Sequence, residues 1–247
     1  MSTRSVTIDC FPSSAARYAP THAIVCIDVI RATTTAVTAA AAGRRVFPVP
    51  SLETAVPLAA RLENPLLVGE LGGNAPYGFH LTNSPAQIVG RPDVERPMIL
   101  LSTSGTPLLW EARGARLTFA ACLRNLSAQA DHLAARWDGP VAVIGAGSRQ
   151  EFRDEDAMCC AWLADKLLAR GFATGDEQTE QRVDEWRGMP VEAAGEGHSA
   201  EYLRRTGQVS DLEFVLGHVD DLDGVFPLTG GVVEKLTAED GSLRASA

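Results

Sequence analysis

The chain has 247 residues, of which 45% are hydrophobic and 21% charged, and its 31 acidic and 22 basic residues give a formal net charge of −9. This composition is that of an ordinary globular protein and excludes the disordered class. An acidic chain lacks the basic face that a nucleic-acid-binding protein needs, so we expect no nucleic-acid partner, although a local basic pocket can still bind a small anion. No apolar run is long enough to span a membrane and no signal peptide is evident, so we expect no membrane partner, a cytoplasmic location and five reduced, buried cysteines.

Strand-like and helix-like segments alternate along the chain. In chain order, we expect strands over residues 23–30, 45–49, 66–70, 98–101, 116–120, 141–146 and 225–228, and helices over 33–42, 52–62, 107–113, 126–136 and 157–170. The polar, acidic segment 174–190 indicates a surface excursion, and the last sixty residues give only weak helical signals. The alternation predicts a single α/β domain over residues 1–247, with a layered α/β/α architecture and a mostly parallel or mixed sheet.

Two stretches of the chain share one layout. Residues 24–47 and 95–118 each read as strand, Ser- and Thr-rich turn, helix, glycine, arginine and strand. A duplicated βαβ unit would produce this echo, and so would the ordinary alternation of α/β proteins; both interpretations stay open. Between the two stretches, residues 71–97 contain four glycines and four prolines, and so long an irregular segment inside a compact domain is often functional.

Polar side chains follow several of the predicted strands. Because ligands of open α/β sheets bind beyond the carboxyl ends of the strands, these residues are the candidates for a site. Arginines there can hold phosphate or sulfonate oxygens in bidentate fashion, and carboxylates can hold a hard cation such as Mg²⁺. The candidates are Asp28, Arg31, Thr33, Thr34, Thr35, Glu70, Ser102, Thr103, Ser104, Gly105, Thr106, Arg149, Arg153, Glu155 and Asp156.

Each of these groups also has a purely structural interpretation. The threonines 33–35 can cap the helix that they open, and the acidic run 154–156 is what a helix N-terminus favours electrostatically. Asp28 interrupts an apolar strand, and a buried carboxylate needs a partner or a metal. An Asp28–Arg31 ion pair is therefore the alternative to a metal site.

The common phosphate-handling motifs are absent from the sequence. There is no GxxxxGK[ST] loop, and no cysteine has an arginine at the spacing of the Cys-based phosphatases. Residues 221–225 (DLDGV) match the DxDG[TV] loop of haloacid-dehalogenase phosphatases, but they follow a polar segment rather than a buried first strand. We therefore expect an acidic turn there.

Four motifs in order resemble those of the 2-phosphosulfolactate phosphatase family. The run 27–35 (IDVIRATTT) resembles its N-terminal signature, and it is followed by 69–73 (GELGG) with Gly78-Phe79 and 83–85 (NSP), by 102–106 (STSGT), and by Glu155-Asp156. The resemblance extends over roughly residues 24 to 170. It implies a layered α/β fold and a Mg²⁺-dependent acid phosphatase that hydrolyses 2-phospho-3-sulfolactate to 3-sulfolactate and phosphate, a step towards coenzyme M.

Roles for individual residues follow as a hypothesis from this resemblance. Asp28, Arg31 and Glu70 are the expected catalytic residues, and Asp28, Glu70, Glu155 and Asp156 the expected Mg²⁺ ligands. The expected substrate-binding residues are Thr33, Thr34, Thr35, Asn83, Ser102, Thr103, Ser104, Gly105 and Thr106 around the phosphate, with Arg149 or Arg153 on the sulfonate or carboxylate.

The third motif departs from the family pattern. Ser104 and Pro107 stand where the family commonly has an asparagine and a basic residue. This leaves as alternatives a phosphatase for another small phosphorylated organic acid, or a relative that binds anions without turnover. A homodimer is an open alternative for the assembly.

Overall fold

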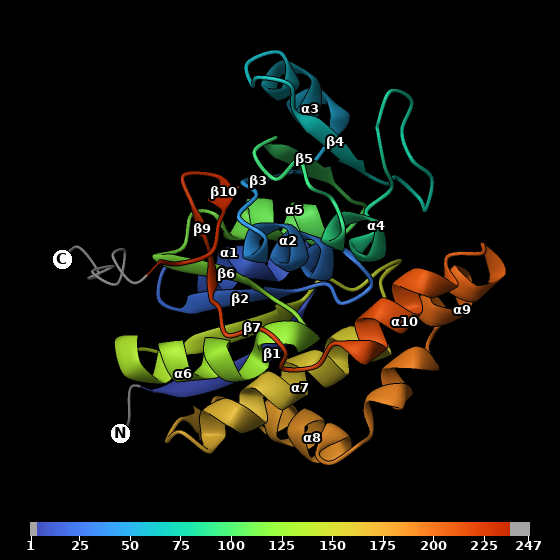
Figure 1. Cartoon of the computed structure of the whole chain (residues 1–247). Helices are drawn as coiled ribbons and strands as arrows, with labels where there is room; N and C mark the ends of the chain where they lie inside the picture. Colours follow the sequence, from blue (N-terminus) through green and yellow to red (C-terminus); the bar gives the residue numbers. More distant parts are fainter. Residues whose placement is uncertain (1–3, 238–247) are drawn as a thin grey trace.

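The computed structural model describes residues 4–237 and has an α/β fold with helices on both faces of one sheet (Figure 1). The strands are β1 (Ser5–Cys10), β2 (Ala23–Ile27), β3 (Val46–Val49), β4 (Leu66–Gly69), β5 (Met98–Leu101), β6 (Leu117–Ala121), β7 (Val141–Gly145), β8 (Ala173–Thr174), β9 (Phe226–Thr229) and β10 (Val232–Val233). The α-helices are α1 (Ala15–Tyr18), α2 (Ala32–Ala41), α3 (Leu52–Ala59), α4 (Pro85–Val89), α5 (Gly105–Ala112), α6 (Leu126–Arg136), α7 (Asp154–Leu168), α8 (Glu177–Trp186), α9 (His198–Arg205) and α10 (Val209–Gly217). The predicted α/β class is confirmed.

The sheet consists of two parallel blocks joined by an antiparallel hairpin. Its strand order over the described residues is β4-β5-β3-β10-β9-β6-β2-β7-β1-β8. β4, β5 and β3 run parallel, as do β6, β2, β7, β1 and β8, whereas β9 and β10 pair antiparallel with each other and with their neighbours β6 and β3. The C-terminal hairpin therefore converts two parallel sheets into one mixed sheet.

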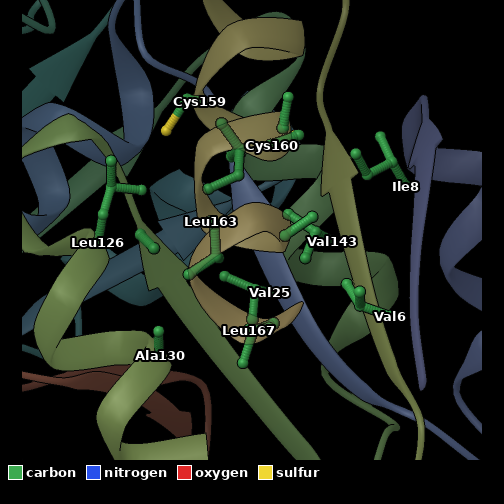
Figure 2. Close-up of a cluster of buried hydrophobic side chains, with 14 of the residues drawn as sticks. Val6, Ile8, Val25, Leu126, Ala130, Val143, Cys159, Cys160, Leu163 and Leu167 are labelled. Carbon is green, nitrogen blue, oxygen red and sulfur yellow. The ribbon is translucent and has the colours of Figure 1, made fainter. Parts of the chain in front are cut away.

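The central strand β2 is buried on both faces, which explains its uninterrupted apolar sequence. Val25 and Ile27 enter a core formed with α6 and α7, whereas Ile24 and Cys26 enter a core formed with α2 and α5. Figure 2 shows the first core, in which side chains of α6 and α7 pack over the strand residues. This alternation gives the predicted three layers.

The two stretches with the shared layout are both crossovers between the parallel blocks. The chain passes from β2 through α2 to β3, and later from β5 through α5 back to β6. Both helices contribute to the same core, so they lie on the same face of the sheet. Their N-termini consequently meet at the carboxyl ends of β2 and β5, where the candidate site is expected.

Several elements differ from the sequence prediction. β1 was not predicted, and segment 174–190, predicted as a surface excursion, contains the amphipathic helix α8, which buries Thr179 and Val183. α7 begins at Asp154, three residues before the predicted start, so the acidic run forms its first turn. α5 begins at Gly105 after Ser104, and Thr106 lies inside the helix instead of capping it. Over the described residues, no helix is both long and apolar enough to cross a membrane.

Candidate active site

A cavity of about 500 Å³ lies at the carboxyl ends of the central strands and is lined by residues of both crossovers and of helix α9. Its volume is that of a typical small-molecule site. Ten predicted site residues line it: Asp28, Arg31, Glu70, Asn83, Thr103, Ser104, Arg149, Arg153, Glu155 and Asp156. These residues come from five segments of the chain, so the fold brings together what the sequence keeps apart.

Asp28 lies directly after β2 and is held by the N-termini of two helices. Its Oδ1 accepts a hydrogen bond of 2.9 Å from Ala32 N of α2, and the backbone N–H of Gly105 at the start of α5 also donates to the carboxylate. Burial nevertheless raises the pKa of the Asp28 carboxyl to about 6, against the lowering effect of the Ala32 bond and with a further rise from the charge of Glu70. The carboxylate is thus well bonded and still costly to ionise.

Glu155 and Asp156 form the first turn of α7. Asp156 accepts hydrogen bonds from Val29 N at 2.8 Å and from Gly147 N at 3.2 Å. Burial raises its pKa well above the usual value, and the charges of Asp28 and Glu155 raise it further. Burial raises the pKa of Glu155 to about 7, although the Ser199 side chain donates to it, and Glu155 Oε2 is enclosed without a hydrogen-bond partner in the described part of the chain.

Glu70 ties the glycine turn after β4 to the loop after β5. Its carboxylate accepts hydrogen bonds from Gly73 N at 2.7 Å, Thr103 N at 2.7 Å and Thr103 Oγ1 at 3.0 Å. These three bonds use most of its acceptor capacity. Glu70 therefore shapes the cavity wall, and its predicted role as a Mg²⁺ ligand stays a prediction.

Three carboxylates of the cavity fit a hard divalent cation by their donor set. Asp28, Glu155 and Asp156 offer only oxygen ligands. Beside the effect of burial, the negative charge of Asp28 raises the pKa of Glu155 and of Asp156, and that of Glu155 raises the pKa of Asp156. The enclosed, unpartnered Glu155 Oε2 is the kind of atom that a bound cation would satisfy. Over residues 4–237, no three His, Cys, Asp or Glu side chains already converge as a metal cluster.

Basic side chains line the same cavity. Arg31, Arg149, Arg153 and Arg205 line it together with His198. Arg153 Nη1 donates to Glu151 Oε2 at 2.8 Å and lies 3.0 Å from His198 Nδ1, while Arg153 Nε is enclosed with no hydrogen-bond partner among residues 4–237. A cavity lined by both carboxylates and guanidinium groups suits an anion that binds beside a cation.

Arg31 forms its ion pair with Asp211 of α10, so the expected alternative of a structural Asp28–Arg31 pair is wrong. Among the described residues, no ion pair joins Asp28 to Arg31. Both side chains of the actual pair are almost fully buried, at 4% and 3% exposure. Arg31 Nη1 also donates to Gln208 Oε1 at 2.7 Å.

Six predicted substrate-binding residues lie beside the cavity without lining it. The hydroxyls of Thr33 and Thr34 bond the backbone of residues 28 and 29, and Thr35 Oγ1 donates to Arg31 O and to Asn83 O. The Ser102 and Thr106 hydroxyls bond the backbone N–H groups of one another. Gly105 contributes its N–H to Asp28. These side chains support the loops of the site, and their predicted contact with substrate stays a prediction.

The C-terminal helices contribute residues that the sequence prediction missed. His198, Ser199, Tyr202 and Arg205 of α9 line the cavity, and Tyr202 OH donates to Gly73 O at 2.9 Å across it. The buried Ala200 and Leu203 show the helical spacing by which α9 could have been found. No motif marked its polar residues as functional.

Comparison with known proteins assigns the chain to a family. The family model described as 2-phosphosulpholactate phosphatase matches residues 11–229. Three relatives that carry the name "Probable 2-phosphosulfolactate phosphatase" come from Carboxydothermus hydrogenoformans (39% identical over 146 residues, 59% of this chain and 60% of the relative), Deinococcus radiodurans (33% over 212 residues, 84% and 86%) and Thermotoga maritima (30% over 191 residues, 77% and 82%). The chain therefore belongs to the 2-phosphosulfolactate phosphatase family, which confirms the resemblance found in its motifs.

Proposed function

We propose that this protein hydrolyses the phosphate ester of 2-phospho-3-sulfolactate to 3-sulfolactate and phosphate with the help of Mg²⁺. Family membership supports the reaction, and one observation carries the cofactor: the enclosed, unpartnered Oε2 atom belongs to Glu155, which lines a cavity that contains both carboxylates and arginines. A substrate with phosphate, carboxylate and sulfonate groups needs several cationic contacts in one cavity. Arg31, Arg149, Arg153 and Arg205 line the cavity and offer them.

Asp28, Glu155 and Asp156, with Glu70 as a further ligand, would hold the cation, which would neutralise the negative charge that develops on the phosphoryl oxygens. Arg31, at the N-cap of α2, would bind the phosphoryl group. Arg149 or Arg153 would orient the substrate through its sulfonate or carboxylate. In the reaction a water oxygen bonds to phosphorus, the ester P–O bond breaks, and the sulfolactate oxygen takes up a proton.

The test is release of inorganic phosphate from 2-phospho-3-sulfolactate by the purified protein, with Mg²⁺ and with a chelator. We expect turnover only with the cation, and a loss of at least about 100-fold in Asp28→Asn and in Glu155→Gln, since each removes a charged ligand. We also expect loss of Mg²⁺-dependent release in Glu70→Gln. Asp165→Asn is the matched control, because Asp165 is also on α7 but pairs with Arg187 at the surface. Unchanged activity in Asp28→Asn, Glu70→Gln and Glu155→Gln would refute the metal assignment.

A panel of substrates addresses specificity in the same assay. We expect 2-phospho-3-sulfolactate to have a higher kcat/KM than 2-phospholactate, which lacks the sulfonate, or than 3-phosphoglycerate. Faster turnover of a panel member would assign the chain another phosphorylated acid. Binding without any phosphate release would indicate a relative that has lost catalysis.

A further inference from the structure

The ion pair between Arg31 and Asp211 connects two segments that are 180 positions apart in the chain. Arg31 belongs to the first motif at the N-terminus of α2, and Asp211 belongs to the first turn of α10. Both side chains are buried beside the cavity, and Arg31 also lines it. A buried charge pair is costly to desolvate and is often no more stable than an apolar pair, so stability alone is a weak reason for it.

The hydrogen bonds of the pair fix the guanidinium from one end. Arg31 Nη1 donates to both Asp211 Oδ2 and Gln208 Oε1, and these two bonds use both of its N–H groups. Within the described residues, Nε and Nη2 make no hydrogen bond. The planar group is thus held at one edge, while its remaining N–H groups stay available to an anion in the cavity.

Asp211 is itself held by the second motif. Its Oδ1 accepts hydrogen bonds from Ser84 Oγ at 2.5 Å and from Ala86 N at 3.2 Å, and Ser84 also caps α4 by accepting from Gln87 N. The carboxylate therefore joins the first motif, the second motif and the C-terminal helices at one point. α10 in addition packs against α4 and α9.

We propose that Asp211 is a positioning residue that holds the Arg31 guanidinium in the orientation in which it binds the phosphoryl group of the substrate. The inference rests on the proposed function of Arg31 and adds a partner to it. The pair holds Arg31 desolvated and oriented before substrate arrives, so the guanidinium loses little conformational freedom when substrate binds. It also makes α10 part of the active site, although α10 carries none of the family motifs.

The test is a double-mutant cycle with Asp211→Asn, Arg31→Ala and the double variant. We expect about 100-fold lower kcat/KM in Arg31→Ala, as for loss of a donor to a developing charge, and about 10-fold or more in Asp211→Asn. If Asp211 acts through Arg31, the double variant has the kcat/KM of Arg31→Ala within about twofold. If the two losses multiply, Asp211 has only a structural role and the proposal is wrong.

Rescue by a soluble guanidinium compound gives a readout that would not change if Asp211 had only a structural role. Methylguanidinium should restore part of kcat/KM in Arg31→Ala, where Asp211 can bind it, but not in the double variant. Equal rescue in both would overturn the proposal. The double variant removes both charges, so it remains testable even if Asp211→Asn fails to fold with an unpaired buried arginine.

One further measurement separates this proposal from the proposed function. Binding of inorganic phosphate, measured by titration calorimetry on the same variants, needs no turnover. If the wild type releases no phosphate from 2-phospho-3-sulfolactate, the proposed function is wrong. The same non-additive pattern in phosphate affinity would still support the role of Asp211. If the wild type does not bind phosphate, the proposed role of Asp211 is refuted. Asp221→Asn is the matched control, because it breaks the Arg124–Asp221 pair of 2.6 Å outside the cavity and should leave kcat/KM and phosphate affinity unchanged.

Discussion

Substitution of Gly105 by alanine tests the idea that Asp28 is held tightly between two helix N-termini. A Cβ at position 105 would overlap Asp28 Oδ2 and would come within 2.6 Å of Ala32 Cβ and 2.7 Å of Asp28 Cβ. Real Cβ atoms essentially never show such distances, and two of the three neighbours cannot move without their backbones. Either α5 or the Asp28 loop must therefore shift.

The expected cost follows from two opposing effects. Replacing a helical glycine by alanine stabilises an unobstructed site by about 0.5–1 kcal/mol, whereas forcing an extra carbon into a packed site costs about 1–3 kcal/mol. We expect a net loss of about 1–2 kcal/mol, which for a chain of this size lowers Tm by about 2–8 °C. Because a misplacement of about 1 Å can cost about 100-fold in rate, we expect kcat/KM to fall by at least about 10-fold.

Thermal unfolding and phosphate release on the same preparations measure both effects. Gly114→Ala is the control: Gly114 lies just beyond the other end of α5, its φ is not positive, and a Cβ there meets no atom within 4 Å. We expect wild-type activity and an unchanged or higher Tm for the control. A Gly105→Ala protein with wild-type kcat/KM and an unchanged or higher Tm would refute the tight packing of Asp28.

Three further predictions concern pH, the cavity wall and the cysteines. The pKa of Asp28 is raised to about 6 and that of Glu155 to about 7, so the folded state binds more protons than the unfolded state between about pH 4 and about pH 7, and stability without a divalent cation should fall as pH rises through this range. Thermal unfolding measured at several pH values in the presence of a chelator tests this fall in stability. We expect a smaller fall in Asp28→Asn. A stability that rises over the same pH range would contradict the prediction. Tyr202→Phe removes the hydrogen bond to Gly73 O, so we expect about 1 kcal/mol lower stability by denaturant unfolding and a raised KM, and an unchanged KM would show that Tyr202 does not shape the site. All five cysteines are buried and free, and burial raises the pKa of Cys10 to about 12 and of Cys122 to about 11. We therefore expect a thiol reagent to label the cysteines only when the protein unfolds. Rapid labelling of the native protein would contradict their burial.

The fold could be predicted largely because its central elements are strongly patterned. The run Ala23–Ile27 is apolar and β-branched, as a strand buried on both faces requires, and the alanine-rich segment after it forms α2. The helix α8 was missed because its buried side chains are few, Thr179 and Val183, and the surrounding acidic residues dominate its composition. In a strongly polar helix only two or three positions are buried, so the helical spacing of the buried face gives a weak signal in the sequence.

The candidate site could be predicted in part for a similar reason. Asp28 was identifiable because a carboxylate at the end of an apolar strand is exceptional, and its neighbours in the motif follow from adjacency in the chain. Asp211 and Arg205 were not identifiable, because neither interrupts an apolar pattern and both are brought to the site only by the packing of α9 and α10. Contacts across 180 positions have no local signature.

The charges around the cavity explain how an acidic protein can bind a polyanion. At physiological ionic strength the Debye length is about 8 Å, so the formal charge of −9 acts weakly inside the cavity and the lining residues dominate. Six carboxylates line the cavity, namely Asp28, Glu70, Glu151, Glu155, Asp156 and Glu201, against the four arginines, so with all of them ionised the carboxylates exceed the arginines by two. Burial, and to a lesser extent neighbouring carboxylates, raise the pKa of Asp28 and of Glu155, so these two groups take up protons more readily than free carboxyl groups. A divalent cation would balance the same excess without protons, and the arginines that line the cavity would then be left to bind the anion.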